Sequence, residues 1–253
     1  MTGRASTVAI IPARFASTRL PGKPLADICG KPMIQYVVER TRQANLVDEV
    51  VVATDDERIV NAVQSFGGRA VMTPSELPSG SDRIAYVARS MPGAEIVVNV
   101  QGDEPLIVPA MIDEAIEPLV KDRTIVAGTL VRQIETPEEL LSPSAVKVVL
   151  DRDGYCLYFS RSTVPFLRDV PLPDWLGRHA HYKHIGLYVY RKEFLLRYTE
   201  LPPTPLESLE KLEQLRILEH GYRIKGVVTT HNCVPVDTAE DLERVRKIVR
   251  GSP

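Results

Sequence analysis

Short apolar runs alternate with longer amphipathic stretches over the first half of the chain. The runs are rich in β-branched residues and short enough to be strands, whereas apolar positions in the intervening stretches recur with helical spacing. The predicted strands are 8–11, 49–53, 69–72, 95–100 and 125–131, and the predicted helices are 33–44, 57–66, 81–90 and 109–120. This alternation predicts βαβ units and hence an open, mostly parallel sheet of the α/β class.

The pattern changes from about residue 147 onward. Two short runs, 147–150 and 155–159, are joined by Asp151-Arg152-Asp153-Gly154, whose Asp-Gly ending is typical of a hairpin. The segment 163–177 is rich in proline and is predicted to be an exposed loop. A strand at 185–190, a helix at 206–220, a strand at 223–229 and a charged helix at 238–249 complete the prediction.

The predicted helix at 206–220 carries leucines at every third position, at 206, 209, 212, 215 and 218. A spacing of three drifts around a helix of 3.6 residues per turn, so the apolar band is wide. Such a band can face both a core and a second subunit, which predicts a homodimer.

Composition narrows the class of protein. Of 253 residues, 44% are hydrophobic and 25% are charged, as in ordinary globular domains. Lys and Arg total 31 against 33 Asp and Glu, so the molecule lacks the basic field of a nucleic-acid binder. Cys29, Cys156 and Cys233 form no CxxC pair, and no apolar run reaches the length of a membrane span or a signal-peptide core. We therefore expect a cytoplasmic protein.

Three cations follow the first predicted strand. Ligands of open α/β sheets bind beyond the carboxyl ends of the strands, and Arg14, Arg19 and Lys23 lie there. Arg and Lys bind phosphate oxygens, and backbone amides around Ser17 and Gly22 can complete an anion site. The segment matches neither GxxxxGK[ST] nor GxGxxG, which argues against P-loop kinases and dehydrogenases. A triphosphate is the expected ligand.

Two acidic positions are candidates for a metal site. Asp103 lies in Gln101-Gly102-Asp103-Glu104-Pro105, directly after an apolar run, and Asp237 precedes the last predicted helix. Mg²⁺ often takes one or two carboxylates together with phosphate and water. The first segment is also an ordinary turn sequence, and Asp237 also fits a helix N-cap. From the residues alone, both interpretations stay open.

Polar and aromatic residues of the second half carry weaker signals. Arg161, His184, Tyr188 and Glu213 each also fit an ordinary structural position. His184 has two neighbouring histidines, but neither a Cys nor an HExxH pattern supports a zinc site there.

Taken together, five segments resemble the 3-deoxy-manno-octulosonate cytidylyltransferases. They are IIPARFASTRLPGKPL at 10–25, NVQGDEP at 99–105, AVKVVLD at 145–151, GYCLYFSR at 154–161 and LEQLR at 212–216. The resemblance spans about residues 8–249, and the segments of the second half distinguish this family from related sugar nucleotidyltransferases.

The resemblance implies a nucleotide-diphospho-sugar transferase fold with an antiparallel subdomain for substrate binding and dimerisation. It implies a single domain over 1–253, in which 1–131 binds CTP, 132–222 binds the sugar and dimerises, and 223–253 returns to the α/β part. The implied partners are CTP and 3-deoxy-manno-octulosonate (Kdo), the implied cofactor is Mg²⁺, and the implied assembly is a homodimer. The implied reaction gives CMP-Kdo and pyrophosphate for lipopolysaccharide synthesis.

The resemblance also implies roles for individual residues. The nucleotide is bound by Ala13, Arg14, Ser17, Arg19, Lys23, Gly80, Ser81 and Arg83. The sugar is bound by Gln101, Arg161, His184, Tyr188, Glu213 and Gln214. Asp103 and Asp237 bind Mg²⁺ and form the catalytic group with Arg14 and Lys23. The sequence departs from the family pattern at Phe15, Leu77 and Val189.

Two alternatives to Kdo transfer stay open. One is a cytidylyltransferase for another acid sugar, such as a sialic acid or 8-amino-Kdo, which the first loop does not distinguish from a Kdo enzyme and to which the departure at Leu77 points. A nucleotide-binding regulator without turnover is disfavoured because Lys23, Asp103 and Asp237 are all present.

Overall fold

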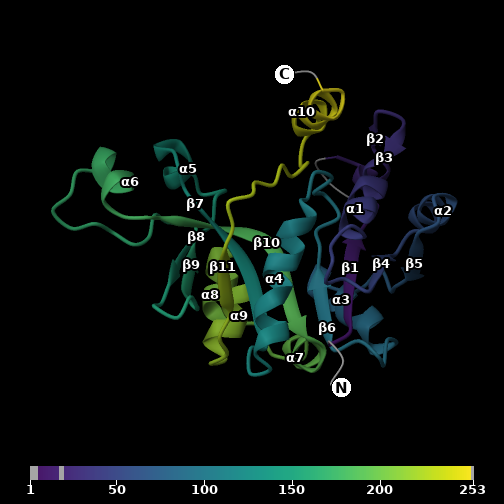
Figure 1. The fold of residues 1–253 in the computed structure, drawn as a ribbon, viewed down its shortest axis with the longest axis horizontal. Coiled ribbons are helices and arrows are strands. Elements are labelled where there is room, and N and C mark those ends of the chain that lie inside the picture. Colours follow the sequence, from purple (N-terminus) through teal and green to yellow (C-terminus); the bar gives the residue numbers. More distant parts are fainter. Residues whose placement is uncertain (1–4, 17–19, 252–253) are drawn as a thin grey trace.

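The computed structural model describes residues 5–16 and 20–251. Its main sheet has the strand order β11-β7-β10-β6-β1-β4-β5, with β8 and β9 attached beside β10 (Figure 1). The strands of the sheet are β1 (Thr7–Ala13), β4 (Glu49–Thr54), β5 (Arg69–Met72), β6 (Ile96–Asn99), β7 (Ala127–Gln133), β8 (Lys147–Leu150), β9 (Cys156–Ser160), β10 (Tyr182–Arg191) and β11 (Lys225–Val228). Only β10, among the strands of the order given above, runs antiparallel to its neighbours, so the predicted mostly parallel sheet is confirmed.

Helices cover both faces of this sheet because its central strands are apolar on both sides. Along β1, Ala9 and Ile11 pack into one core, and Val8 and Ile10 pack into the other. The helices and short elements are η1 (Lys23–Leu25), β2 (Asp27–Ile28), β3 (Lys31–Pro32), α1 (Met33–Thr41), α2 (Glu57–Ser65), α3 (Gly80–Arg89), α4 (Pro109–Lys121), α5 (Pro137–Leu141), η2 (Leu172–Asp174), α6 (Trp175–Arg178), α7 (Lys192–Tyr198), α8 (Pro205–Glu210), α9 (Gln214–Glu219) and α10 (Ala239–Val249). Helices α1, α2 and α4 supply the first core, and α3, α7 and α9 supply the second.

The predicted continuous helix over 206–220 is wrong. It is divided into α8 and α9, because Lys211 takes a left-handed conformation (φ 55°) at the end of α8. Arg161 Nε donates to Glu210 O at 2.7 Å and so satisfies a carbonyl that a continuous helix would use. The break resets the helical phase, and Leu212 and Leu215 are buried while Leu209 is 79% exposed. The predicted wide apolar band is therefore mostly core.

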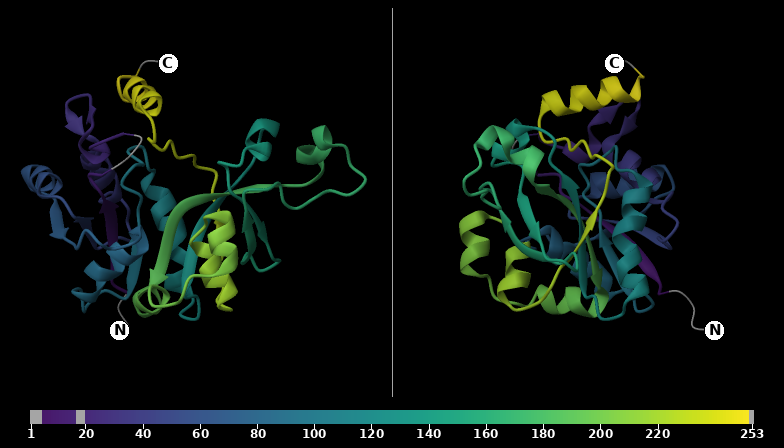
Figure 2. Two further views of the ribbon diagram at one scale, coloured as in Figure 1. Left: turned by 180° about the vertical axis from the view of Figure 1, so that it is seen from behind. Right: turned by 60° about the vertical axis from the view of Figure 1, so that its left-hand side comes forward.

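The segment 163–177, predicted to be an exposed loop, contains one buried residue, Trp175. Most of the segment is exposed and, with α6, it extends from the body as an arm (Figures 1 and 2). Trp175 is nevertheless buried against Ile134 and Leu140, and its Nε1 donates to Val170 O at 2.9 Å. The short helices α5 and α7 were not predicted; α5 contacts the start of β10 through Glu139 and Lys183, and α7 follows the end of β10.

Candidate functional site

The loops after β1 and β6 meet at one edge of the sheet, where they form a cavity of about 350 Å³. The pairing of β1 with β6 is parallel, so both carboxyl ends lie side by side. The lining residues are Pro12, Ala13, Arg14, Ala16, Lys23, Pro24, Gln101, Gly102, Asp103 and Asp237. The cavity thus brings Ala13, both described cations of the first loop and both predicted metal ligands together. Ser17 and Arg19 lie outside the described residues.

Lys23 stands between the two carboxylates. Its Nζ lies 2.6 Å from Asp103 Oδ2 and 3.2 Å from Asp237 Oδ1. Val236 N donates to Asp103 O at 2.9 Å, which fixes the segment before α10 against the loop after β6. The N-cap of α10 is Thr238, whose Oγ1 accepts from Asp241 N, so the alternative of Asp237 as the cap is wrong. Two carboxylates from distant segments therefore converge on one cation.

Two glycines allow the loops to approach each other. Gly22 is left-handed (φ 68°) at the start of η1, a conformation that glycine adopts without strain. A Cβ at Gly102 would lie 2.7 Å from Pro12 O, closer than side chains normally come to a backbone oxygen. Gly102 was not among the predicted site residues, although a glycine beside Asp103 was visible in the sequence.

Arg14 connects the cavity to the segment before α3. Its Nη2 donates to Leu77 O, so the departure from the family pattern at Leu77 lies beside this contact. Helix α3 begins at Gly80, and its N-cap Ser79 accepts from Asp82 N at 3.1 Å. Gly80 lies against Pro12, since a Cβ there would be 3.6 Å from Pro12 Cγ. Of the predicted nucleotide-binding residues, Arg14 therefore lines the cavity and Gly80 lies against Pro12 in its wall.

Arg83 does not line this cavity in the part of the chain that the structure describes. Its side chain is fully buried, and the guanidinium pairs with Asp55 at 2.8 Å and donates to Thr73. Burial lowers the pKa of Arg83, and the nearby Asp55 carboxylate opposes this effect. Arg83 thus joins the ends of β4 and β5 to α3, a role that the sequence did not reveal.

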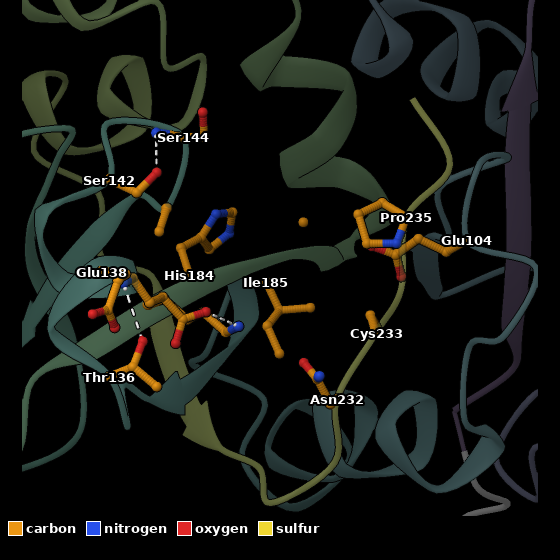
Figure 3. Close-up of a pocket in the computed structure, with 14 residues that line it drawn as sticks. Glu104, Thr136, Glu138, Ser142, Ser144, His184, Ile185, Asn232, Cys233 and Pro235 are labelled. Atoms are coloured by element: carbon orange, nitrogen blue, oxygen red, sulfur yellow. Dashed lines mark hydrogen bonds and ion pairs between the residues drawn. The ribbon is translucent and has the colours of Figure 1, made fainter. Parts of the chain in front are cut away.

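Figure 3 shows a larger cavity, of about 680 Å³. Its walls come from the segments 136–145, 183–186 and 232–235, together with Glu104. Gln101 joins the two cavities, because it lines the first and its Nε2 donates to Gly186 O, in the wall of the second, at 2.9 Å.

His184 stands in this second cavity, between the loop carrying Ser142 and Ser144 and the segment carrying Cys233 (Figure 3). Its Nε2 is 2.9 Å from Thr129 Oγ1. That hydroxyl donates to Leu187 O at 2.8 Å, so His184 Nε2 carries the hydrogen and Nδ1 keeps its lone pair. Burial lowers the pKa of His184 to about 3. The imidazole is therefore a neutral acceptor.

Three further predicted sugar residues, Tyr188, Glu213 and Gln214, line neither cavity in the described part of the chain. The Tyr188 ring lies 5.1 Å from the His184 ring, and burial raises the pKa of its hydroxyl. Ser81 Oγ donates to Glu213 Oε2 at 3.0 Å, which joins α3 to the start of α9. Gln214 is buried, and its Nε2 has no hydrogen-bond partner within the described structure.

The Arg161 side chain is engaged with main-chain carbonyls. Besides Glu210 O, it donates to Pro143 O at 3.1 Å and to Lys211 O at 3.4 Å. Two of its five N–H groups remain after these bonds. The structure thus places Arg161 at the break between α8 and α9, next to the segment 142–145.

Glu104 is a buried carboxyl in the wall of the second cavity that the sequence analysis did not select. It is 7% exposed, and burial raises its pKa to about 7, with a further increase from Asp103. Contact with the Cys233 thiol acts in the opposite direction. Glu-Pro reads as a turn in the sequence, so nothing there indicated burial.

No cluster of three or more His, Cys, Asp or Glu residues suited to a metal occurs in the described ranges. Within the same ranges, the longest apolar helices are too short or too polar to cross a membrane.

Comparison with known proteins agrees with this geometry. A model of the cytidylyltransferase family matches residues 8–224. The chain therefore belongs to the cytidylyltransferases.

Two curated relatives show to which group of cytidylyltransferases the chain belongs. The chain is 60% identical to the 3-deoxy-manno-octulosonate cytidylyltransferase of Geobacter sulfurreducens, over 94% of this chain and 96% of that protein. It is 51% identical to the protein of that name from Solibacter usitatus, over 96% and 94% of the two chains. Within its class, the chain is thus a member of the 3-deoxy-manno-octulosonate cytidylyltransferase family, which confirms the resemblance.

Solved structures show the same fold. The structure of CMP:2-keto-3-deoxy-manno-octonic acid synthetase complexed with CTP superposes with a TM-score of 0.91 at 42% identity, over 98% of this chain and 99% of that one. The 4-diphosphocytidyl-2C-methyl-D-erythritol synthase from Anaerococcus prevotii matches with a TM-score of 0.62 at 15% identity, over 97% and 96%. The second likeness concerns the fold alone. The predicted nucleotidyltransferase fold is confirmed.

Proposed function

We propose that this protein transfers CMP from CTP to Kdo, giving CMP-Kdo and pyrophosphate. The observation that carries the proposal is the pair of adjoining cavities, joined by Gln101, in a chain of this family. One cavity has the cations and carboxylates that a triphosphate and its metal require. The other is large enough for a sugar acid, and Ser142, Lys183 and His184 are among the polar residues that line it.

Charge balance supports the first cavity as the triphosphate site. The four charged side chains that line it, Arg14, Lys23, Asp103 and Asp237, sum to zero, so the cavity by itself has no net positive charge for a triphosphate. One Mg²⁺ would raise the sum to about +2, with Arg14 beside the phosphates. Lys23 and Arg14 would then stabilise negative charge on the leaving pyrophosphate.

The residues present fit Mg²⁺. Asp103 and Asp237 already converge on one cationic group, and Mg²⁺ needs only one or two carboxylates when phosphates and waters complete its shell. When bound, the metal would neutralise phosphate charge and favour the ionised form of a sugar hydroxyl. Asp103 and Asp237 would hold it, and Lys23 would move from between them toward the phosphates.

The acceptor hydroxyl would come from the second cavity. The anomeric 2-hydroxyl of Kdo would attack the α-phosphorus of CTP while pyrophosphate leaves in line. Gln101 and neutral His184 offer a donor and an acceptor for sugar hydroxyls, and the remaining Arg161 N–H groups suit a carboxylate. Tyr188, Glu213 and Gln214 complete the proposed sugar set, and Gly80, Ser81 and Arg83 stay in the proposed nucleotide set.

The test is pyrophosphate release from CTP and Mg²⁺, with and without Kdo. We expect Kdo-dependent release by the native protein and a loss of roughly 100-fold or more in Asp103→Ala and Asp237→Ala, since each removes a metal ligand. The exposed pair Lys121–Glu117 offers a matched control, and Glu117→Ala should keep full activity. Release that is equal with and without Kdo would refute the proposal.

A homodimer in the cytoplasm is also part of this proposal. Large apolar side chains are exposed in the proposed dimerisation part, with Leu157 at 60%, Phe166 at 76% and Leu209 at 79%. Burial of such side chains against a second copy would stabilise an association. The reaction consumes CTP, a cytoplasmic nucleotide.

A further inference from the structure

Lys147 is a fully buried cation at the edge of the second cavity. It lies on β8, and its side chain has no exposed surface. Its Nζ donates to Ser142 O at 2.8 Å, to Ala145 O at 2.6 Å and to Arg161 O at 2.7 Å. An ammonium has three hydrogens, so each is used on a main-chain carbonyl.

Burial of the Lys147 ammonium costs free energy, because a charged group loses its hydration. Burial lowers the pKa of Lys147, the charge of Glu210 opposes this effect, and Arg161 reinforces it. All three acceptors of the ammonium are neutral main-chain carbonyls, and an apolar side chain of similar volume would leave them without this donor. Lys147 therefore holds three carbonyls, and the segments that carry them, around one buried point.

The three carbonyls belong to segments that meet the proposed sugar site. Ser142 and Ala145 line the second cavity, and Val146 O, between Ala145 and Lys147, accepts from His184 N at 2.8 Å. The third carbonyl is that of Arg161, whose side chain holds the carbonyls at the α8–α9 break. That break directly precedes the proposed sugar residues of α9.

Hydrogen bonds to the Glu210 carboxylate fix the position of the main chain at residues 160 and 161. Glu210 accepts from Arg161 N at 2.9 Å and from Ser160 Oγ at 2.7 Å. Lys147 and Arg161 thus tie three segments, 142–145, 160–161 and 210–211, into one unit. None of these segments lines the first cavity in the described part of the chain.

We propose that Lys147 is a positioning residue of the acceptor-sugar site, which sets the cavity wall and Arg161 in place without contacting the sugar. The inference rests on the proposed function. Because the unit borders the sugar cavity and not the nucleotide cavity, loss of Lys147 raises KM for Kdo and leaves KM for CTP unchanged.

The test compares Lys147→Met, Lys147→Arg and the control Lys192→Met in steady-state pyrophosphate release. Lys192 is matched because its Nζ also donates to a main-chain carbonyl, Met91 O at 2.8 Å, but it begins α7 away from both cavities. For Lys147→Met we expect KM for Kdo to rise about tenfold or more, since displacements near 1 Å have large kinetic effects. Lys147→Arg keeps the charge but not the geometry, and we expect a smaller rise. KM for CTP should stay within about twofold in all three variants.

Equal increases in both KM values, or an unchanged KM for Kdo in a folded Lys147→Met protein, would overturn the inference. If the Met variant does not fold, the Arg variant decides by the same criterion. If neither folds, Lys147 serves stability alone and the inference also fails. Failure of the proposed function looks different, because the native protein itself would then show no Kdo-dependent release.

Discussion

Gly102→Ala probes the contact between the two loops that form the proposed triphosphate site. The new Cβ would lie 2.7 Å from Pro12 O, about 0.7 Å short of the distance at which ordinary contact begins. The obstacle is backbone, which cannot rotate away as the end of a side chain can. Accommodation therefore requires the loop carrying Asp103 to separate from the end of β1, next to Arg14, by a large fraction of an ångström.

Such a separation should affect catalysis more than folding. Overpacking of this size costs about 1–3 kcal/mol of stability, whereas a misplacement near 1 Å in an active site can cost about 100-fold in rate. We expect kcat/KM for CTP to fall about 10- to 100-fold, measured by pyrophosphate release with Kdo in excess. The control is Gly93→Ala, since a Cβ there meets nothing within 4 Å. Full activity in a folded Gly102→Ala protein would refute the proposed meeting of the two loops.

Two further predictions concern protonation and assembly. Burial lowers the pKa of His184 to about 3, so the imidazole stays neutral above about pH 4. Its NMR signals should not titrate between about pH 5 and 8, and stability should gain from this group as pH rises from about 3 to 6.5 and no further. A midpoint near 6.5 would contradict a neutral His184 that accepts a hydrogen bond at Nδ1. For the dimer, sedimentation should give about twice the chain mass of 28.2 kDa, and Leu157→Glu should shift it toward the monomer. A monomeric native protein would exclude the proposed assembly.

Local patterns in the sequence predicted the sheet and the first cavity well. Apolar runs defined the central strands, and parallel strand ends necessarily lie together, so Arg14, Lys23 and Asp103 could be grouped before the structure was known. Asp237 was ambiguous, because helix N-caps and metal ligands use the same residue types. Only the structure shows that Asp237 contacts Lys23 and that Thr238 is the N-cap of α10.

Features that depend on distant segments could not be predicted. The break after α8 depends on the left-handed Lys211 and on a bond from Arg161, about 50 residues earlier in the chain. The family resemblance places Arg83 among the nucleotide-binding residues, but the sequence did not show that partners from two other strand ends hold its side chain inside the core. Lys147 lies in the segment 145–151, which resembles the family, but nothing in the sequence of a strand indicates that a lysine is buried. Each case depends on polar contacts that hydrophobic periodicity does not encode.

The sugar acid that receives CMP can be identified directly by analysis of the products. The native protein is given CTP and Mg²⁺ with an equimolar mixture of Kdo, 8-amino-Kdo and a sialic acid, and the CMP-sugars formed are measured by mass spectrometry together with pyrophosphate. We predict CMP-Kdo as the main product, with one pyrophosphate released per molecule formed and none without an acceptor. Preferential formation of another CMP-sugar, or no CMP-sugar at all, would contradict this prediction.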